Sequence, residues 1–411
     1  MIREPRLLSR LLPFALAGGL LGAGVAPLAF GPKAVAAQEQ SALIVDDAQT
    51  ANPDLVQTEV ADPNGFGISG HTLMAPPGTT ISIVAAQLGA PRFMTFDRAG
   101  NLLVTTQDDG IVYRYPYANG NLGQPEALIT GLNQPASVVL FTAGGTEYLY
   151  VGETQQVTRF PYDPAGPVGG EEVVIPDLPT GGHRTRTVAF GRDGMLYLAV
   201  GSSCNICEET DQIRATISRA NPDGSDLQII ATGLRNPVGL AFQPGTDSLW
   251  ATVNERDNQG NEIPPDLVTI ITAGANYGWP HCQPPDATPQ QTGADCANIT
   301  PPTVGIQAHS APLGLAFLTG NGVPAALDGD LVVAQHGSWN RQPPAAPKLL
   351  QLDFENGAPV AAHDLVTGWQ DDNGDRWGRP AGVVVAPDGS LIVSDDQAGL
   401  LYRISLGETS S

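Results

Sequence analysis

A short pattern of apolar and polar positions recurs along most of the chain. Each copy has an apolar strand, a turn of Gly, Asp or Asn, and a second apolar strand, often followed by a third strand that contains Arg. The copies begin at residues 93–96, 138–141, 187–190, 240–242, 315–317 and 383–385. Apolar runs bounded by such turns predict β-hairpins rather than amphipathic helices.

The spacing of these copies predicts the architecture. They lie about 45 residues apart early in the chain and farther apart later, where loops intervene. Together with 48 glycines and 36 prolines, this repeat predicts an all-β, six-bladed β-propeller over residues 79–407. An array of β-sandwiches is the alternative, but it would not repeat the same turn chemistry. In a propeller the loops of one face surround the central channel, so function is expected there.

The first residues predict export. Arg3, Arg6 and Arg10 precede an apolar stretch at 11–30, and small residues follow at 34–37. This order is typical of a secretory signal peptide, which we predict at 1–37. An uncleaved membrane anchor is the alternative, because the apolar stretch is almost long enough to span a bilayer. We expect a periplasmic or extracellular protein, with no stable membrane insertion after cleavage and a polar linker or surface tail at 38–78.

The charge pattern limits the partners. Residues 38–411 carry a net charge of −25, which disfavours nucleic acid and anionic membranes as partners. Lys348 is the only lysine in this part, beside fifteen arginines. The planar fork of Arg suits the recognition of carboxylates. Pairing with abundant surface Asp and Glu is the alternative explanation for most of them.

The four cysteines form two local pairs, Cys204 with Cys207 and Cys282 with Cys296. In an exported protein we expect two short-loop disulfides, with a zinc site as the alternative. Glu208 follows the first pair where a c-type haem motif would have His.

Two segments place polar residues just before an expected inner strand. His183 stands ahead of the third repeat, where a neutral imidazole is able to take a proton from a substrate hydroxyl. Arg235 and Asn236 stand ahead of the fourth, and Pro237 favours an extended or turn geometry for Asn236. The alternatives are a structural or surface histidine and a structured turn.

A third segment offers oxygen ligands. Glu255 and Arg256 lead to Pro264-Pro265-Asp266. Carboxylates beside proline-fixed backbone carbonyls supply the oxygens that calcium prefers, although the spacing is not that of an EF-hand.

Several motifs resemble the soluble glucose/sorbosone dehydrogenases. They are His183 ahead of Phe190-Gly191-Arg192-Asp193-Gly194, the run from Leu234 to Phe242, and Asn276-Tyr277-Gly278-Trp279-Pro280. Residues 202–209 and 335–341 resemble the sorbosone branch in particular. The resemblance covers roughly residues 75–405.

The resemblance implies a cofactor and a mechanism. In that family pyrroloquinoline quinone (PQQ) lies on the top face of the propeller, held by arginines and a calcium ion. His183 matches the general base, and Arg235, with Asn236 beside it, matches the arginine that stabilises the reduced quinone. Asp266 and the backbone near Glu255 and Arg256 match the calcium neighbourhood.

Further cofactor contacts follow from the resemblance. Arg379 matches an arginine that binds a cofactor carboxylate, and Gln134 corresponds to a glutamine of a cofactor loop. Arg341 and Lys348 are alternatives for one cationic position. The second arginine of the late pair has no clear counterpart, because Ala381 or Arg376 falls there.

Two functions remain open at this point. The first is an exported dehydrogenase that oxidises an aldose or a related sugar or aldehyde with PQQ and calcium, and passes electrons to an external acceptor. The second is a non-catalytic propeller that binds a carbohydrate or a protein.

Overall fold

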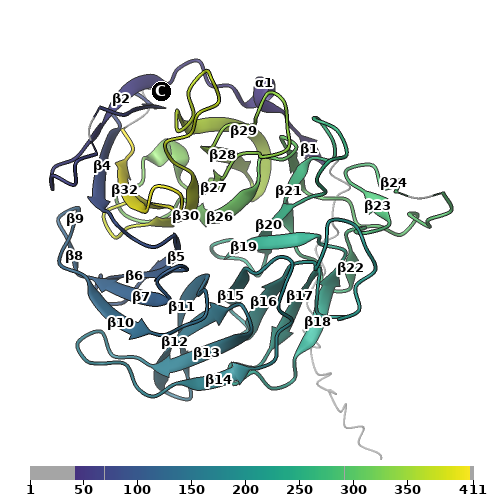
Figure 1. The fold of residues 1–411 in the computed structure, drawn as a ribbon, viewed down its shortest axis with the longest axis horizontal. Helices are drawn as coiled ribbons and strands as arrows, with labels where there is room; N and C mark the ends of the chain where they lie inside the picture. The colour runs from purple at the N-terminus through teal and green to yellow at the C-terminus, as the bar shows by residue number, and fades with distance from the viewer. Residues whose placement is uncertain (1–41, 69, 291, 408–411) are drawn as a thin grey trace, which may run out of the picture. The chain divides into compact units, whose positions relative to one another are not determined.

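The computed structural model describes residues 42–68, 70–290 and 292–407, so the expected signal peptide at 1–37 lies outside the described residues. The described chain is mainly β-structure, with a helix α1 (Asp47–Thr50) and a 3-10 turn η1 (Ala325–Leu327). Figure 1 shows its sheets set around a common centre. No helix in this part of the chain is long and apolar enough to cross a membrane. The fold is the expected all-β propeller.

Two sheets are antiparallel four-stranded meanders. One contains β5 (Pro91–Phe96), β6 (Leu102–Thr106), β7 (Ile111–Tyr115) and β10 (Glu126–Thr130). The next contains β11 (Ser137–Ala143), β12 (Thr146–Glu153), β13 (Gln156–Pro161) and β14 (Glu172–Ile175).

Two further sheets gain a fifth strand. The first has β15 (Arg186–Phe190), β16 (Leu196–Val200), β17 (Thr216–Ala220) and β18 (Gln228–Thr232), with β22 (Ala275–Asn276) parallel to β18. The second has β19 (Asn236–Phe242), β20 (Leu249–Asn254), β21 (Asp266–Ile270) and β25 (Val304–Ile306), with β1 (Leu43–Ile44) parallel to β25.

A ten-stranded sheet joins two meanders. The first has β26 (Pro312–Phe317), β27 (Leu331–Gln335), β28 (Lys348–Glu355) and β29 (Ala358–Thr367); the second has β30 (Pro380–Val385), β31 (Leu391–Asp395), β32 (Leu400–Ser405) and β4 (Thr80–Ala85). They are linked by β3 (Thr72–Ala75) and β2 (Val56–Ala61). Part of the segment expected as a linker or surface tail therefore contributes strands. Small two-stranded ribbons lie outside the sheets: β8 (Tyr117–Ala118) with β9 (Asn121–Leu122), and β23 (Cys282–Gln283) with β24 (Thr288–Pro289).

The hairpin turns follow from local sequence. In the turn from β30 to β31, Asp388 Oδ1 accepts hydrogen bonds from Ser390 N at 3.2 Å and Ser390 Oγ at 2.6 Å. Gly389 follows with a φ of 81°, which a residue with a Cβ atom adopts only at a cost. Asp193-Gly194 occupies the corresponding turn from β15 to β16. An Asp-Gly pair therefore forms the turn between the first and second strands of each of these two hairpins.

The first strands of the meanders form a closed ring. Each of β5, β11, β15, β19, β26 and β30 contacts the next, and β30 contacts β5. Together they line a central cavity of about 250 Å³. Because the second strand of each meander is antiparallel to the first, the loops after the second strands reach the end at which the first strands begin. One face therefore gathers two sets of loops.

Both expected disulfides are present, Cys204–Cys207 and Cys282–Cys296. The second spans a sequence separation of 14 residues, and a loop of about 15 residues stabilises a fold by about 3 kcal/mol. The double variant Cys282→Ala/Cys296→Ala is expected to lose about that free energy of unfolding in a denaturant titration. Cys204→Ala/Cys207→Ala, which opens a shorter loop, is expected to lose less. Four alkylatable thiols in the native protein would contradict both bonds.

Candidate functional site

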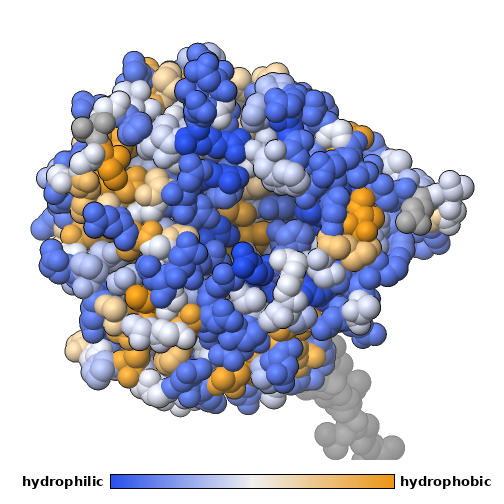
Figure 2. All heavy atoms as spheres, in the orientation of Figure 1, coloured by the Kyte–Doolittle hydropathy of each residue, from blue (hydrophilic) through white to orange (hydrophobic). Residues whose placement is uncertain are grey.

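The candidate residues from the middle repeats lie on the face where the inner strands begin. His183 precedes β15, while Arg235 and Asn236 stand at the start of β19. The loop 201–215 joins β16 to β17 and reaches the same face, as does the loop 255–265 between β20 and β21. Figure 2 shows that one face of the molecule is hollowed near its middle, with hydrophilic residues around the hollow.

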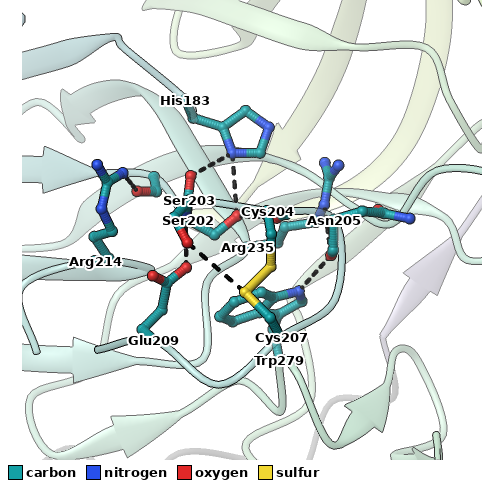
Figure 3. Close-up of a disulfide and its surroundings, with 11 residues drawn as sticks. His183, Ser202, Ser203, Cys204, Asn205, Cys207, Glu209, Arg214, Arg235 and Trp279 are labelled. Atoms are coloured by element: carbon teal, nitrogen blue, oxygen red, sulfur yellow. Dashed lines mark hydrogen bonds between the residues drawn. A yellow bond between two sulfur atoms is a disulfide. The ribbon is translucent and has the colours of Figure 1, made fainter. Parts of the chain in front are cut away.

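The His183 ring is held by Ser202 (Figure 3). Its Nδ1 lies 2.9 Å from Ser202 O and 3.1 Å from Ser202 Oγ. The Ser202 hydroxyl donates its own proton to Cys204 O at 2.7 Å. Both Ser202 oxygens therefore act as acceptors, and Nδ1–H is the donor. This arrangement leaves the lone pair on Nε2, where it is able to accept a proton.

The charge state of His183 suits a base. Burial lowers the pKa of His183 to about 4, and the Arg235 guanidinium acts in the same direction, as do Arg214 and Arg186. The ring is therefore neutral at neutral pH. A neutral imidazole with a free nitrogen is the form in which histidine abstracts a proton.

In the protein without ligand, the His183 ring is expected to titrate near pH 4 rather than near 6.5. Between these values the unfolded chain binds a proton that the folded chain does not. The stabilising contribution of this group is therefore fully present above about pH 6.5 and is lost as the pH falls to about 4. An NMR titration of the ring, assigned with His183→Ala, measures the shift. A midpoint near 6.5 would contradict the buried cationic environment.

Arg235 is 3% exposed and donates all around its guanidinium. Nε donates to Asn205 O at 3.2 Å, and Nη1 to Glu255 O at 2.6 Å. Nη2 forms an ion pair with Asp257 Oδ2 at 2.6 Å. The guanidinium is thus a fixed cation beside His183, held by groups from two loops.

The disulfide loop positions Arg235. Asn205, between Cys204 and Cys207, exchanges two hydrogen bonds with the backbone of Asp257, at 2.9 Å and 2.8 Å. Its carbonyl accepts the indole N–H of Trp279 at 2.9 Å as well as Arg235 Nε. Figure 3 shows His183, the disulfide and Trp279 around this loop. The loop 201–215 therefore contacts both His183, through Ser202, and Arg235, through Asn205, and fixes their relative positions.

Asn236 brings an unpaired polar atom to this place. Its Oδ1 is buried and has no hydrogen-bond partner among the described residues. A Cβ atom at Gly201 would clash with Asn236 Oδ1 and would lie 2.7 Å from His183 Cβ. Glycine at 201 therefore permits the close approach of the two side chains. A buried acceptor without a partner is costly, which indicates a place where a ligand donor would be stabilised.

The predicted metal residues are close together but differ in what they offer. Asp266 accepts hydrogen bonds from Glu255 N at 2.7 Å and Ala311 N at 2.8 Å, and burial raises its pKa to about 6. Burial also raises the pKa of Glu255, whose Oε1 has no partner among the described residues. The Arg256 side chain pairs with Glu255 and donates to Cys282 O at 2.6 Å. Arg256 is thus able to offer a metal only its backbone carbonyl.

Within the described part of the chain, Cys204, Cys207 and Glu209 bring potential metal-ligand atoms to within 4.8 Å of one another. Those cysteines are disulfide-bonded, so this cluster is no metal site.

Three of the predicted cofactor residues are engaged within the protein. Lys348 pairs with Asp47 at 2.9 Å and Asp364 at 2.7 Å, which ties α1 to the ten-stranded sheet. Arg341 Nη2 pairs with Glu262 Oε1 at 2.8 Å. Gln134 has a φ of 50°, and its side chain accepts from Thr154 Oγ1 at 3.4 Å.

Arg379 belongs to another group on the same face. It donates to the carbonyls of His336 and Gly337, each at 2.8 Å. His336 Nε2 lies 2.6 Å from Asp396 Oδ1, and Arg92 pairs with the other oxygen at 2.6 Å. Arg92 and Asp396 are not among the site residues predicted from the sequence. Their positions in the repeat could have indicated this face, since Arg92 lies at the start of the inner strand β5 and Asp396 lies in the loop after the second strand β31.

The site brings together a neutral imidazole (His183), a fixed guanidinium (Arg235) and the amide oxygen of Asn236, which has no partner among the described residues. Such a set is able to take a proton from a hydroxyl while a nearby cation stabilises negative charge.

A family described as TrAA12-like matches the chain over residues 73–288 and 273–406. The PQQ-dependent pyranose dehydrogenase of Coprinopsis cinerea is 27% identical over 398 residues, which cover 80% of this chain and 54% of that protein. The chain spans about half the length of several curated relatives that it matches.

Two solved structures share the fold. The holo form of the pyranose dehydrogenase PQQ domain from Coprinopsis cinerea matches with a TM-score of 0.71 and 24% identity, covering 87% of this chain and 100% of that domain. The calcium structure of the Trichoderma reesei enzyme of family AA12 matches with a TM-score of 0.72 and 22% identity, covering 84% and 100%.

Proposed function

The chain belongs to the TrAA12-like family, and we propose that it is an exported quinoprotein dehydrogenase that oxidises an aldose or a related sugar or aldehyde with PQQ. Its relatives include PQQ-dependent sugar dehydrogenases, which supports an oxidoreductase with a small sugar substrate. The motifs at 202–209 and 335–341 support a place in the sorbosone branch. We further propose six blades: the four smaller sheets and the two meanders of the ten-stranded sheet.

The observation that carries the proposal is the state of His183. Its Nδ1–H is donated to Ser202 O, and its low pKa leaves Nε2 unprotonated at neutral pH. His183 would remove the C1 hydroxyl proton of the sugar. PQQ, when bound, would supply the hydride acceptor. Arg235, held beside His183, would stabilise the negative charge that grows on the ligand oxygen.

The residues present fit a quinone with several carboxylates and ring oxygens. Arg235, Asn236 and Arg379 would hold it, because each lies on the face where the inner strands begin and Asn236 Oδ1 lacks a partner among the described residues. Gln134 would contact it from the start of β11. Arg341 and Lys348 would contribute positive charge, although both are paired with carboxylates, as Arg235 is.

We also propose that calcium binds near Asp266. Glu255 Oε1 lacks a partner in the described part of the chain, and carboxylate and carbonyl oxygens suit calcium. A divalent cation beside Glu255 and Asp266 would offset the burial that raises the pKa of both groups.

Calcium is expected to raise the melting temperature, and a chelator is expected to lower it and to release bound quinone. Asp266→Asn should remove both responses, because it removes a charged oxygen ligand. Differential scanning fluorimetry with added calcium, magnesium or chelator measures the first response, and quinone absorbance after desalting measures the second. Asp353→Asn, a change at a partly exposed carboxylate that pairs with His363, is the control. If a chelator changes neither the melting temperature nor the quinone retention of the wild type, calcium does not bind near Asp266.

A non-catalytic binding module is the second candidate. It is favoured by the internal pairing of Arg235, Arg341 and Lys348 with Asp257, Glu262 and Asp47, because these cations need no ligand. Purified protein with PQQ and calcium, given a panel of aldoses and an artificial electron-accepting dye, distinguishes the two. Sugar-dependent dye reduction supports the dehydrogenase, whereas binding of sugar without dye reduction supports the module.

A further inference from the structure

A group of cationic side chains lies where the last inner strand meets the first. We call it the cationic corner and define it as Arg92, Arg376, Arg379 and His336, with Asp396 among them. Arg92 stands in β5, Arg379 immediately precedes β30, and these strands contact each other in the inner ring. The backbone of Arg92 accepts a hydrogen bond from Ser394 Oγ of β31 at 2.6 Å. The corner therefore joins residues that are nearly 300 positions apart in sequence.

Positive charge exceeds negative charge in this corner. Arg92 pairs with Asp396 at 2.6 Å. Burial acts to raise the pKa of Asp396, but the hydrogen bond from His336 and the charge of Arg92 outweigh it, so this carboxyl stays ionised. Burial raises the pKa of Asp395, and its oxygens are taken by Tyr402 and by backbone N–H groups of the 397–398 turn.

The cations of the corner repel one another. Burial and, after it, the charge of the neighbouring Arg376 lower the pKa of Arg379 to about 10. In a chain with a net charge of −22, this corner sets three arginines, of which Arg92 is buried and Arg376 and Arg379 are half-buried, against two carboxylates, so positive charge is in excess. Such a site is stabilised by an anion.

Donors in the corner remain free for a ligand. Arg92 is 6% exposed, and its Nε is buried without a hydrogen-bond partner among the described residues. Arg379 donates from Nε and Nη2 to backbone carbonyls, and Arg376 donates from Nε to Gln370 and from Nη2 to Ala345 O. Nη1 of each of these two guanidiniums makes no hydrogen bond to a described residue, so it is free for another acceptor.

We propose that the cationic corner binds a carboxylate of the ligand, and that Arg92 supplies the second cation that the late part of the sequence lacks. The assignment of that carboxylate to the quinone rests on the proposed function. The partner of Arg379 is thus an arginine of the first inner strand rather than a neighbour in sequence. His336 and Asp396 fix the fork of Arg92, while the carbonyls of His336 and Gly337 fix that of Arg379.

The test measures ligand affinity in the protein without cofactor. Arg92→Ala is expected to weaken PQQ binding by about 10- to 100-fold, the effect of losing a hydrogen-bonded charge pair. Arg92→Lys keeps the charge beside Asp396 but loses the planar guanidinium. Its PQQ affinity should therefore lie between that of Arg92→Ala and that of the wild type. Arg98→Ala is the matched control, because Arg98 is largely exposed and pairs with Glu147 at 2.6 Å in a hairpin turn. It should bind as the wild type does.

A redox-inert tricarboxylate, benzene-1,3,5-tricarboxylate, separates this proposal from the proposed function. The wild type should be stabilised thermally by this anion, and Arg92→Ala should respond less. If the anion binds through Arg92 but PQQ does not bind, the cationic corner stands and the dehydrogenase proposal fails. If folded Arg92→Ala and wild type bind PQQ and the tricarboxylate equally well, the corner proposal is overturned. Circular dichroism and melting temperature establish that each variant is folded.

Discussion

His183→Ala is expected to lower the rate of sugar-dependent dye reduction by about 10²- to 10⁴-fold, the usual effect of removing a general base. Quinone affinity should stay near that of the wild type, because Arg235, Asn236 and Arg379 would still hold the cofactor. The loss should appear in kcat, since the base acts on the bound sugar. Steady-state dye reduction gives the rate, and absorbance titration gives the affinity.

The matched control for this variant is His363→Ala. His363 is a partly exposed histidine of β29, outside the face where the inner strands begin, and its Nε2 lies 3.1 Å from Asp353 Oδ2 of β28. It should leave rate and affinity unchanged. Wild-type turnover in His183→Ala would remove His183 as the base, whatever the effect on quinone binding.

Arg235→Ala is expected to impair both steps. Removing a preplaced cation costs about 10²- to 10³-fold in rate in comparable sites, and losing a charged donor weakens quinone binding by about 10- to 100-fold. The change also leaves Asp257 without its ion pair of 2.6 Å. Rate and affinity should therefore fall together, in contrast to His183→Ala.

Two controls separate ligand binding from loss of structure. Arg235→Lys keeps a positive charge near Asp257 and should retain part of the affinity, but not the forked contacts to Asn205 O and Glu255 O. Arg219→Ala removes an arginine that is partly exposed and lies 3.7 Å from Asp193, and it should be neutral. Unchanged quinone affinity in a folded Arg235→Ala would contradict its role.

The sequence predicts the propeller well because the signals for hairpins are local. The apolar run 196–200 becomes β16, and the run 391–393 lies in β31. Asp-Gly turns separate each of them from the preceding inner strand. Each of these features depends on neighbours within ten residues, so a single sequence contains the necessary information. The two disulfide pairs are confirmed as well, and their cysteines are only 3 and 14 positions apart in the sequence.

Contacts between distant segments were not foreseen. Strands β2 and β3, from the N-terminal part of the chain, join two meanders formed mainly by its C-terminal part, and β4 pairs with β32. Lys348 is paired with Asp47, about 300 residues earlier. Polar segments without periodicity give no sign of the edge to which they will pair.

The site was predicted where a motif stands beside an inner strand, and not where pairing depends on another blade. His183, Arg235 and Asn236 are brought together because their strands are neighbours in the ring. The pairing of Arg92 with Asp396 was not predicted, since an isolated arginine in β5 gives no indication of a carboxylate in the loop after β31. Buried charge pairs are set by three-dimensional packing, and local sequence does not encode them.

We propose above all that this chain transfers electrons from a sugar to a bound quinone. The most direct measurement is the absorbance of PQQ bound to the purified protein with calcium, followed without oxygen while an aldose or aldehyde is added. One equivalent of substrate is expected to reduce one equivalent of bound quinone, and in His183→Ala with quinone bound this reduction is expected to be far slower. Bound quinone that stays oxidised with every sugar and aldehyde tested would contradict it.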